Sequence, residues 1–220
     1  MNYENKASDY YSNIRLDLVE LIDADKKNLK VLEIGAAYGE TLNYLKENGI
    51  ANEAVGIELY EDKNNTVRYK KIDKFIFGNI NEIQIPEYDN YFDLILLPDV
   101  LEHIFEPKIA LAKAKKFLKE DGEMIVSMPN IRHYSAFVKI FIKGNFQYDE
   151  SGLFDYTHAR FYCKSDIIKL LEDSNFKIIK IQSSITNFKG KSFTKVINLV
   201  TFGIFEQFFS FQYFFKIKKV

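Results

Sequence analysis

Short apolar runs recur along the first 130 residues, and a polar segment separates each run from the next. Runs of this length that are apolar almost throughout are typical of strands buried on both faces of a sheet. Glycine or proline stands at or near the end of each run, as expected where a buried strand stops. We therefore predict five strands, carried by KVLEIG (30–35), EAVGIE (53–58), KFIFGN (74–79), YFDLILLPD (91–99) and GEMIVSMPN (122–130).

The segments between these runs have the spacing of amphipathic helices or are rich in lysine. Regular alternation of short apolar strands with helices predicts a parallel sheet covered on both faces. The predicted helices lie in residues 8–22, in 40–49 with a stop at Gly49, in the polar segment 59–73, and in 107–122 with a stop at Gly122.

The pattern changes after Pro129. We expect a helix in 131–144, a long loop to 162, a helix in 165–175 with Ser165 as N-cap, and a mostly helical segment from Lys189 to Ser210. FKIIKIQSSI (176–185) and FQYFFKIKKV (211–220) predict a sixth and a seventh strand, paired antiparallel. The predicted fold is α/β and Rossmann-like, with a seven-stranded, mostly parallel sheet, helices on both faces and an antiparallel last strand.

The length of 220 residues suits one domain. We divide it into a helical cap (1–28), a core that binds a cofactor (29–130), an insertion on the side where a second substrate, the acceptor, would bind (131–163), and a C-terminal part. The C-terminal part (164–220) has a helix, strands and a basic aromatic segment.

Charge and cysteine content narrow the class of protein. Thirty basic and thirty-one acidic side chains nearly cancel, which argues against nucleic acid as the main partner. Cys163 is the single cysteine, so no internal disulfide forms and a reducing compartment is expected. The first residues lack a signal-peptide pattern, and no apolar run reaches the ~18 residues of a membrane span. We expect a cytoplasmic protein.

The C-terminal part has a composition of its own. Residues 176–220 contain eight lysines, ten phenylalanines and a single acid, Glu206. A packed strand and helix with solvated lysines would account for this composition. An acceptor-binding cap, a homodimer surface or a peripheral membrane contact are the alternatives.

The stretch VLEIGAAYGE (31–40) is a strand that ends in a glycine turn and leads into a helix. A dinucleotide fingerprint needs a small residue at its third glycine position, where this chain has Glu40. A second acid, Glu33, precedes the turn and would also repel a pyrophosphate. No Gly-Lys-Ser/Thr follows, which excludes a Walker-type phosphate loop. A ligand that carries a sulfonium and an ammonium cation suits these acids better.

VLEIGAAYG resembles the first motif of class I S-adenosylmethionine-dependent methyltransferases, with Ala37 in place of the middle glycine. Glu58, 23 residues after Gly35, stands where the family binds the ribose hydroxyls, and Asn79 in GNI (78–80) replaces an acid beside the adenine. FDLILLPDVLEHI (92–104) resembles the fourth motif. The resemblance implies cofactor contacts from Glu33, Gly35, Ala36, Ala37, Tyr38, Gly39, Glu58, Leu59, Gly78, Asn79, Ile80, Leu97, Pro98 and Asp99. THARFY (157–162) resembles a subgroup associated with bacterial surface-glycan synthesis.

Methyl transfer to a hydroxyl needs a base for the proton, whereas an amine can attack through its lone pair. His103, His133 and His158 are the three histidines, and each is a candidate base. His103 could instead pack at a helix start, and His158 with Arg160 could fasten a loop over the site. Tyr134, Asp155 and Arg160 are the candidate acceptor-binding residues.

The spacing of the histidines along the chain matches no metal-ligand motif, so we expect no metal. The expected activity is methyl transfer from S-adenosyl-L-methionine to a small or carrier-linked acceptor, such as a sugar hydroxyl or amino group. A methyltransferase-like binding protein without turnover, a methyltransferase for another small metabolite such as a quinone, and a nicotinamide-dependent oxidoreductase are the alternatives.

Overall fold

The computed structural model describes residues 13–63, 66–187, 198 and 200–220. Its strands are β1 (Leu29–Ile34), β2 (Ala51–Glu58), β3 (Lys74–Phe77), β4 (Phe92–Pro98), β5 (Leu118–Pro129), β6 (Phe176–Ser183) and β7 (Gln212–Lys219). Its α-helices are α1 (Leu16–Val19), α2 (Glu40–Glu47), α3 (Pro107–Phe117), α4 (Tyr134–Phe137), α5 (Lys164–Asp173), α6 (Ser184–Asn187) and α8 (Glu206–Phe209). Short 3-10 helices lie at Arg68–Lys71, Pro86–Tyr88, Leu101–His103 and Gly152–Phe154, and a π-helical turn at Val138–Ile142.

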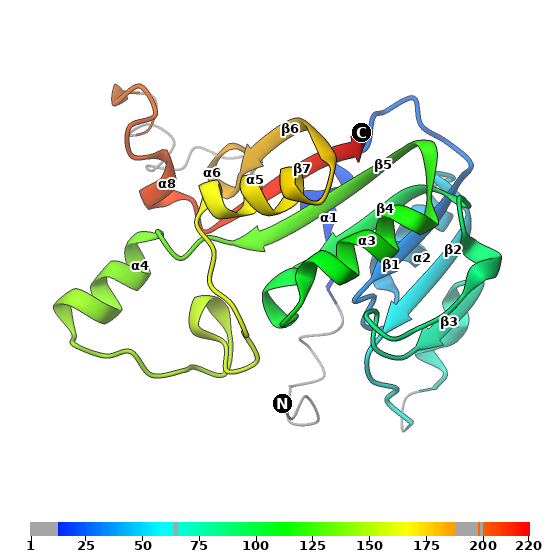
Figure 1. The fold of residues 1–220 in the computed structure, drawn as a ribbon, viewed down its shortest axis with the longest axis horizontal. Coiled ribbons are helices and arrows are strands. Elements are labelled where there is room, and N and C mark those ends of the chain that lie inside the picture. Colours follow the sequence, from blue (N-terminus) through cyan, green and yellow to red (C-terminus); the bar gives the residue numbers. More distant parts are fainter. Residues whose placement is uncertain (1–12, 64–65, 188–197, 199) are drawn as a thin grey trace.

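The seven strands form one sheet in the order β3-β2-β1-β4-β5-β7-β6 (Figure 1). The pairs among β1 to β5 are parallel, whereas β7 runs antiparallel to both of its neighbours, β5 and β6. The predicted fold class, including the antiparallel last strand, is confirmed. The sequence did not show that β7 inserts between β5 and β6, which gives the last strand two partners.

Both faces of the sheet are buried under apolar side chains. Along β4, Ile95 and Leu97 belong to the core that includes residues of α3 and α5. The alternate residues Leu94 and Leu96 belong to the core that includes residues of α1 and α2. Successive strand side chains point to opposite faces, so a strand buried on both sides must be apolar at every position. This requirement explains the unbroken apolar runs of the sequence.

Several predicted boundaries were wrong. The helix expected over 107–122 ends at Phe117, because Leu118 is extended and fully buried at the start of β5, and Gly122 lies inside that strand. Helix α5 is capped by Cys163 rather than Ser165, with the Asp166 carboxylate accepting from the Cys163 N–H at 2.9 Å.

The predicted helix over 59–73 is replaced, in its described part, by turns and one short 3-10 helix. This polar segment offers few apolar side chains to a helix–sheet contact, and most helical stability comes from such contacts.

The helices predicted over 8–22 and 189–210 lie partly outside the described residues. Within the described part, the first is limited to α1. The second has helical residues at 198 and 200, turns from 201 to 205, and α8. In the portion of the chain that the structure describes, no helix combines the length and the apolar character that crossing a membrane requires.

Gly56 in β2 leaves space for Phe75 in β3 and for Ala36 in the turn that follows β1. A Cβ built on Gly56 would lie 2.7 Å from a ring carbon of Phe75 and 3.0 Å from the Cβ of Ala36. We therefore expect Gly56→Ala to lower the free energy of unfolding by about 1–3 kcal/mol in urea denaturation. As a control, Gly49→Ala fills open space at a φ of +65°, so backbone strain alone should lower stability by about 1 kcal/mol. A Gly56→Ala protein as stable as wild type would contradict this assignment of close packing.

Candidate cofactor site

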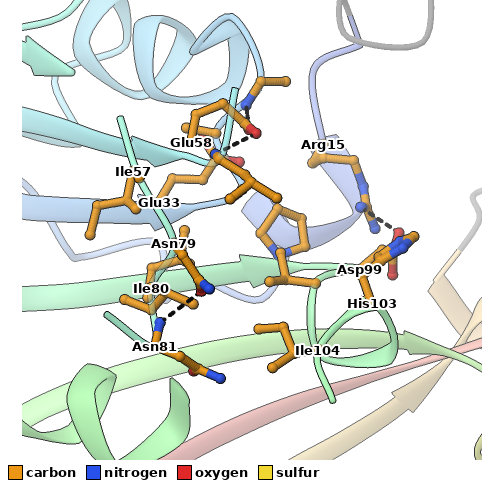
Figure 2. A pocket seen from close by; sticks show the side chains of 18 of the residues that line it. Arg15, Glu33, Ile57, Glu58, Asn79, Ile80, Asn81, Asp99, His103 and Ile104 are labelled. Carbon is orange, nitrogen blue, oxygen red and sulfur yellow. Dashed lines mark hydrogen bonds and ion pairs between the residues drawn. The ribbon is translucent and has the colours of Figure 1, made fainter. Parts of the chain in front are cut away.

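A cavity of about 830 Å³ opens at the carboxyl ends of β1, β2 and β4. Loops that follow these strands and β3 line it, together with the N-terminal segment around Arg15 (Figure 2). In open α/β sheets this edge is the usual place for a ligand. The lining residues include seven acids and one arginine, Arg15. This excess of negative charge suits a cationic ligand and disfavours a phosphate.

The glycine turn after β1 forms one wall. The Gly35 N–H donates to the Ile57 carbonyl oxygen at 2.8 Å. Gly35 has a φ of +78°, and an added Cβ would lie 2.5 Å from the Val100 side chain. Conformation and space therefore both require glycine here. Ala37, which replaces the middle glycine of the motif, also has a positive φ, +50°, so the departure from the motif is accompanied by backbone strain.

Glu58, at the end of β2, holds this turn. Its Oε2 accepts the Ala37 N–H at 2.8 Å and its Oε1 accepts the Leu59 N–H at 2.7 Å. Burial raises the pKa of the Glu58 carboxyl, and the backbone N–H donors partly oppose that rise. Each carboxylate oxygen can accept a second hydrogen bond, so the same group can receive both hydroxyls of a ribose.

Glu33 lies one residue before the end of β1 and is only 2% exposed. Its Oε2 is buried, with no hydrogen-bond partner among the described residues. Burial raises the pKa of this carboxyl to about 8, with Arg15 lowering it and Glu58 raising it further. A buried acceptor oxygen without a donor is a feature that a ligand ammonium or hydroxyl would satisfy.

Asn79 begins the turn after β3. Its Oδ1 accepts the Asn81 N–H at 3.0 Å, and its Nδ2 donates to Glu82 at 2.8 Å. The amide is therefore fixed by its own turn, and the second lone pair of Oδ1 is the part that remains for an adenine amino group. Asn81 also lines the cavity, and its Oδ1 is buried without a hydrogen-bond partner in the described part of the chain.

Asp99, which follows β4, connects four segments. Its Oδ2 accepts from Arg15 Nη1 at 2.7 Å and its Oδ1 from the Ser127 hydroxyl at 2.8 Å. The Gln212 amide donates to the same Oδ1. Burial lowers the pKa of Arg15, but Asp99 and Asp17 raise it more, so the net shift is upward and the guanidinium stays charged. Sequence patterns pointed to Asp99 but gave no signal for its partners.

Most of the predicted cofactor residues line the cavity, namely Glu33, Gly35, Ala36, Ala37, Glu58, Leu59, Gly78, Asn79, Ile80, Pro98 and Asp99. Tyr38, Gly39 and Leu97 are not among the lining residues described. The Tyr38 hydroxyl instead donates to Asp62 at 2.7 Å. Leu97 is fully buried in the core beneath the strand end.

The three histidines occupy different places. His103 lines the cavity on the side of Asp99 (Figure 2). His133 caps α4 through its Nδ1, which lies 2.8 Å from the Ser135 hydroxyl, and burial lowers its pKa. His158 lies behind His103, with 4.7 Å between the ring centroids. Among the described lining residues, His103 is the one histidine.

The predicted acceptor residues lie away from this cavity, outside the lining residues described. Asp155 is 2% exposed and accepts the Thr157 N–H and hydroxyl. Arg160 donates to the Phe105 carbonyl oxygen at 2.6 Å, so it fastens the 149–163 loop to the turn after β4. Tyr134 is exposed and packs near His133 and Phe208.

A family profile described as a methyltransferase domain matches residues 4–181. The chain belongs to this methyltransferase domain family. An uncharacterized protein of Methanocaldococcus jannaschii is 32% identical over 106 residues, which cover 48% of this chain and 43% of that protein. The ubiquinone/menaquinone biosynthesis C-methyltransferase of Erwinia tasmaniensis is 29% identical over 107 residues, covering 46% and 43%. The match to these curated relatives thus spans less than half of their length.

Among solved structures, a SAM-dependent methyltransferase from Archaeoglobus fulgidus superposes with a TM-score of 0.65 at 21% identity, covering 97% of this chain and 95% of that one. These comparisons confirm the predicted methyltransferase family and fold, and they support S-adenosylmethionine as cofactor. The residues present fit that molecule, because the unpartnered Glu33 oxygen, the Glu58 carboxylate and the glycine turn face one cavity. The predicted glycan subgroup is not supported by them and stays a prediction.

The raised pKa of Glu33 has a measurable effect on stability. The folded protein keeps a proton that the unfolded chain releases near pH 4.5, so this stabilising contribution is complete below that pH and is lost as the pH rises through about 8. Between pH 6 and pH 9, we expect the free energy of unfolding of wild type, measured in urea, to fall by roughly 3 kcal/mol relative to that of Glu33→Gln.

Glu47→Gln, on the exposed side of α2, serves as the control and should follow the wild-type profile. Parallel profiles for wild type and Glu33→Gln would show that Glu33 is not held in a buried, unpartnered state.

Proposed function

We propose that the protein transfers a methyl group from S-adenosylmethionine to a small or carrier-linked acceptor. The observation that carries this proposal is the pair of acids, buried Glu33 and half-buried Glu58, at the ends of neighbouring strands β1 and β2 beside the glycine turn. Glu58 offers paired oxygens to the ribose diol, and Glu33 offers an unpartnered oxygen to the cationic methionine part. A nicotinamide dinucleotide would place its negatively charged pyrophosphate against the same acids, and this repulsion disfavours it as the ligand.

The protein's part in such a reaction is to bind and position. The sulfonium is already an activated methyl donor, so the residues must hold the acceptor behind the methyl carbon and exclude water. Pro98, Asp99 and His103 lie along one side of the cavity and are the proposed acceptor-side residues. His103 is the candidate base that faces the cavity, whereas His133 and His158 lie outside the described lining.

The acceptor is proposed to be a sugar hydroxyl or amino group. The curated relative from Erwinia tasmaniensis is named for C-methylation in quinone biosynthesis, so a phenolic ring is the second class to test. A binding protein without turnover is the remaining alternative, since Ala37 and Asn79 depart from the motif residues.

The cofactor assignment predicts a specific loss of affinity. In calorimetric titration, wild type should bind S-adenosylmethionine and not NAD. Glu58→Ala should weaken binding at least ~100-fold, because two hydrogen bonds to a charged group contribute about 1.5–3 kcal/mol each. The affinity of Glu58→Gln, which keeps one acceptor oxygen, should lie between those of wild type and Glu58→Ala. The exposed control Glu61→Gln should bind S-adenosylmethionine as wild type does.

Turnover is then followed as S-adenosylhomocysteine formation with hydroxyl, amine and phenol acceptors. Binding of NAD in preference to S-adenosylmethionine would overturn the assignment. Binding of S-adenosylmethionine without turnover on any of these acceptor classes would favour the binding-protein alternative.

We also propose that the acceptor is reached at a lipid surface. Exposed apolar side chains gather around α4 and α8, where Phe137 and Phe208 lie 6.3 Å apart between ring centroids. Figure 1 shows both helices at the end of the molecule opposite β3. Phe141, Ile142 and Phe202 are 71%, 69% and 95% exposed. Three lysines of the basic aromatic segment, at 189, 191 and 195, are those that we expect to contact an anionic acceptor or lipid, and they lie outside the described residues.

This surface predicts vesicle binding. Wild type should co-sediment with vesicles that contain anionic lipid, and Phe141→Ser combined with Ile142→Ser should reduce the bound fraction several-fold, because each removes apolar area that enters the interface. Val67→Ser, at a residue 74% exposed on the segment between β2 and β3, is the matched control. Equal binding by all three proteins, or none by wild type, would exclude the surface. A homodimer through the same surface would appear in sedimentation without vesicles.

A further inference from the structure

Glu102 is the most deeply buried acid near the cavity, and its side chain has no evident structural task. It is 0% exposed, and neither carboxylate oxygen has a hydrogen-bond partner among the described residues. Its backbone oxygen accepts the Ala159 and Arg160 N–H groups at 2.9 and 3.0 Å, which fastens the 149–163 loop. A residue of any type could supply that backbone oxygen, so the loop contact does not explain a buried carboxylate, whose desolvation is unfavourable.

Two histidines lie beside this carboxylate. His103 is the next residue, and the fastened loop brings in His158 from 55 residues farther along the chain. One oxygen of Glu102 and one ring nitrogen from each histidine lie within 4.8 Å of one another. We propose that Glu102, His103 and His158 bind a divalent transition-metal ion at the edge of the cavity.

The hydrogen bonds of both histidines favour this role. His103 Nδ1 lies 3.1 Å from the Thr157 carbonyl oxygen, and His158 Nδ1 lies 3.1 Å from the Leu153 carbonyl oxygen. A carbonyl oxygen only accepts, so both Nδ1 atoms carry a proton, and a neutral ring then has its lone pair on Nε2. Metal-binding histidines commonly donate their other N–H to a backbone carbonyl in this way.

Thr157 strengthens the arrangement around His103. Its hydroxyl donates to Asp155 Oδ1 at 2.7 Å and lies 3.0 Å from His103 Nδ1. Because the hydroxyl proton is directed to Asp155, the hydroxyl oxygen accepts from the histidine. The chain Asp155–Thr157–His103 therefore fixes the same tautomer that the carbonyl contact requires, and it gives the buried Asp155 a task in positioning a ligand.

Two histidines and one carboxylate are a ligand set for Zn²⁺ and for other divalent ions that accept imidazole. Tetrahedral ligands at ~2.1 Å from zinc lie roughly 3.4 Å apart, so atoms that lie within 4.8 Å of one another need to move only slightly to bind the ion. Such sites keep a position open for water or substrate. His103 lines the cavity, so the open position faces the acceptor side.

The role of the ion rests on the proposed methyl transfer. With the ion bound, the lone pair of His103 is a ligand, so the ion replaces His103 in the role of base proposed above. A hydroxyl acceptor bound at the open position would release its proton to solvent more readily. The oxygen lone pair then forms the O–C bond as the C–S bond of the sulfonium breaks. The electron pair of that bond stays on sulfur, and the products are the methyl ether and S-adenosylhomocysteine.

The test uses chelator-treated, metal-free protein titrated with Zn²⁺ by calorimetry and with Co²⁺ by visible absorption. One equivalent should bind to wild type and to His133→Asn, a matched change in a buried histidine outside the cluster. Glu102→Gln and His158→Asn should each weaken Zn²⁺ binding at least ~100-fold, since even changes to residues behind the ligands weaken it ~10–100-fold. Metal-free Glu102→Gln should melt no lower than wild type, because it removes an unpartnered buried acid.

S-adenosylmethionine titration of the same metal-free proteins separates this site from the cofactor assignment. Cofactor binding without metal binding in wild type would overturn the metal site alone, and metal binding without cofactor binding would overturn the proposed function alone. Zn²⁺ binding that Glu102→Gln and His158→Asn leave unchanged would place the ion elsewhere and overturn the site. A melting temperature lowered by Glu102→Gln in metal-free protein would assign the carboxylate a structural role instead.

Discussion

Burial of both faces of the sheet determines where this protein can place polar chemistry. Each central strand is covered by apolar side chains on its two sides, from Val31 to Ile34 and from Leu94 to Leu97 with Glu33 as the exception. An unpaired polar side chain within such a strand is unfavourable. Polar groups therefore collect where the strands end, and parallel pairing brings the ends of β1, β2 and β4 to one edge. Glu33 is the exception, because this acid lies within strand β1, at a position that lines the cavity.

The acids at this edge are stabilised unequally. Asp99 receives three donors, from Arg15, Ser127 and Gln212, and so joins the N-terminal segment to the ends of β5 and β7. Glu58 receives backbone N–H groups from the glycine turn. Glu33 and Glu102 instead have oxygens without donors in the described part of the chain. Acids with donors fix the segments around the cavity, while the two acids without donors keep buried oxygens that a ligand donor or a metal ion would satisfy.

Sequence alone was sufficient where a feature is local. Apolar runs gave the strands, and the residues at their ends gave eleven cavity-lining residues out of fourteen proposed cofactor contacts, including Gly35, Glu58 and Asp99. Contacts made across the chain left no such signal. Arg15 meets Asp99 from 84 residues away. His158 lies beside His103 because backbone and side-chain hydrogen bonds fasten its loop. The expectation of no metal rested on spacing along the chain, whereas the three residues of the proposed metal site become neighbours only through the fold.

The structure explains how the glycine turn accommodates Ala37, the residue at which this chain departs from the methyltransferase motif. A non-glycine residue at a φ of +50° is strained, and strain of this kind persists only when the surroundings enforce it. Here the Glu58 carboxylate accepts the Ala37 N–H, and Gly35 is held through the Ile57 carbonyl oxygen. The turn thus keeps the course that glycine would give it, at the expense of some stability. Asn79, whose amide is fixed by its own turn, is the departure that alters what the cavity offers to a ligand, because an uncharged group replaces an acid.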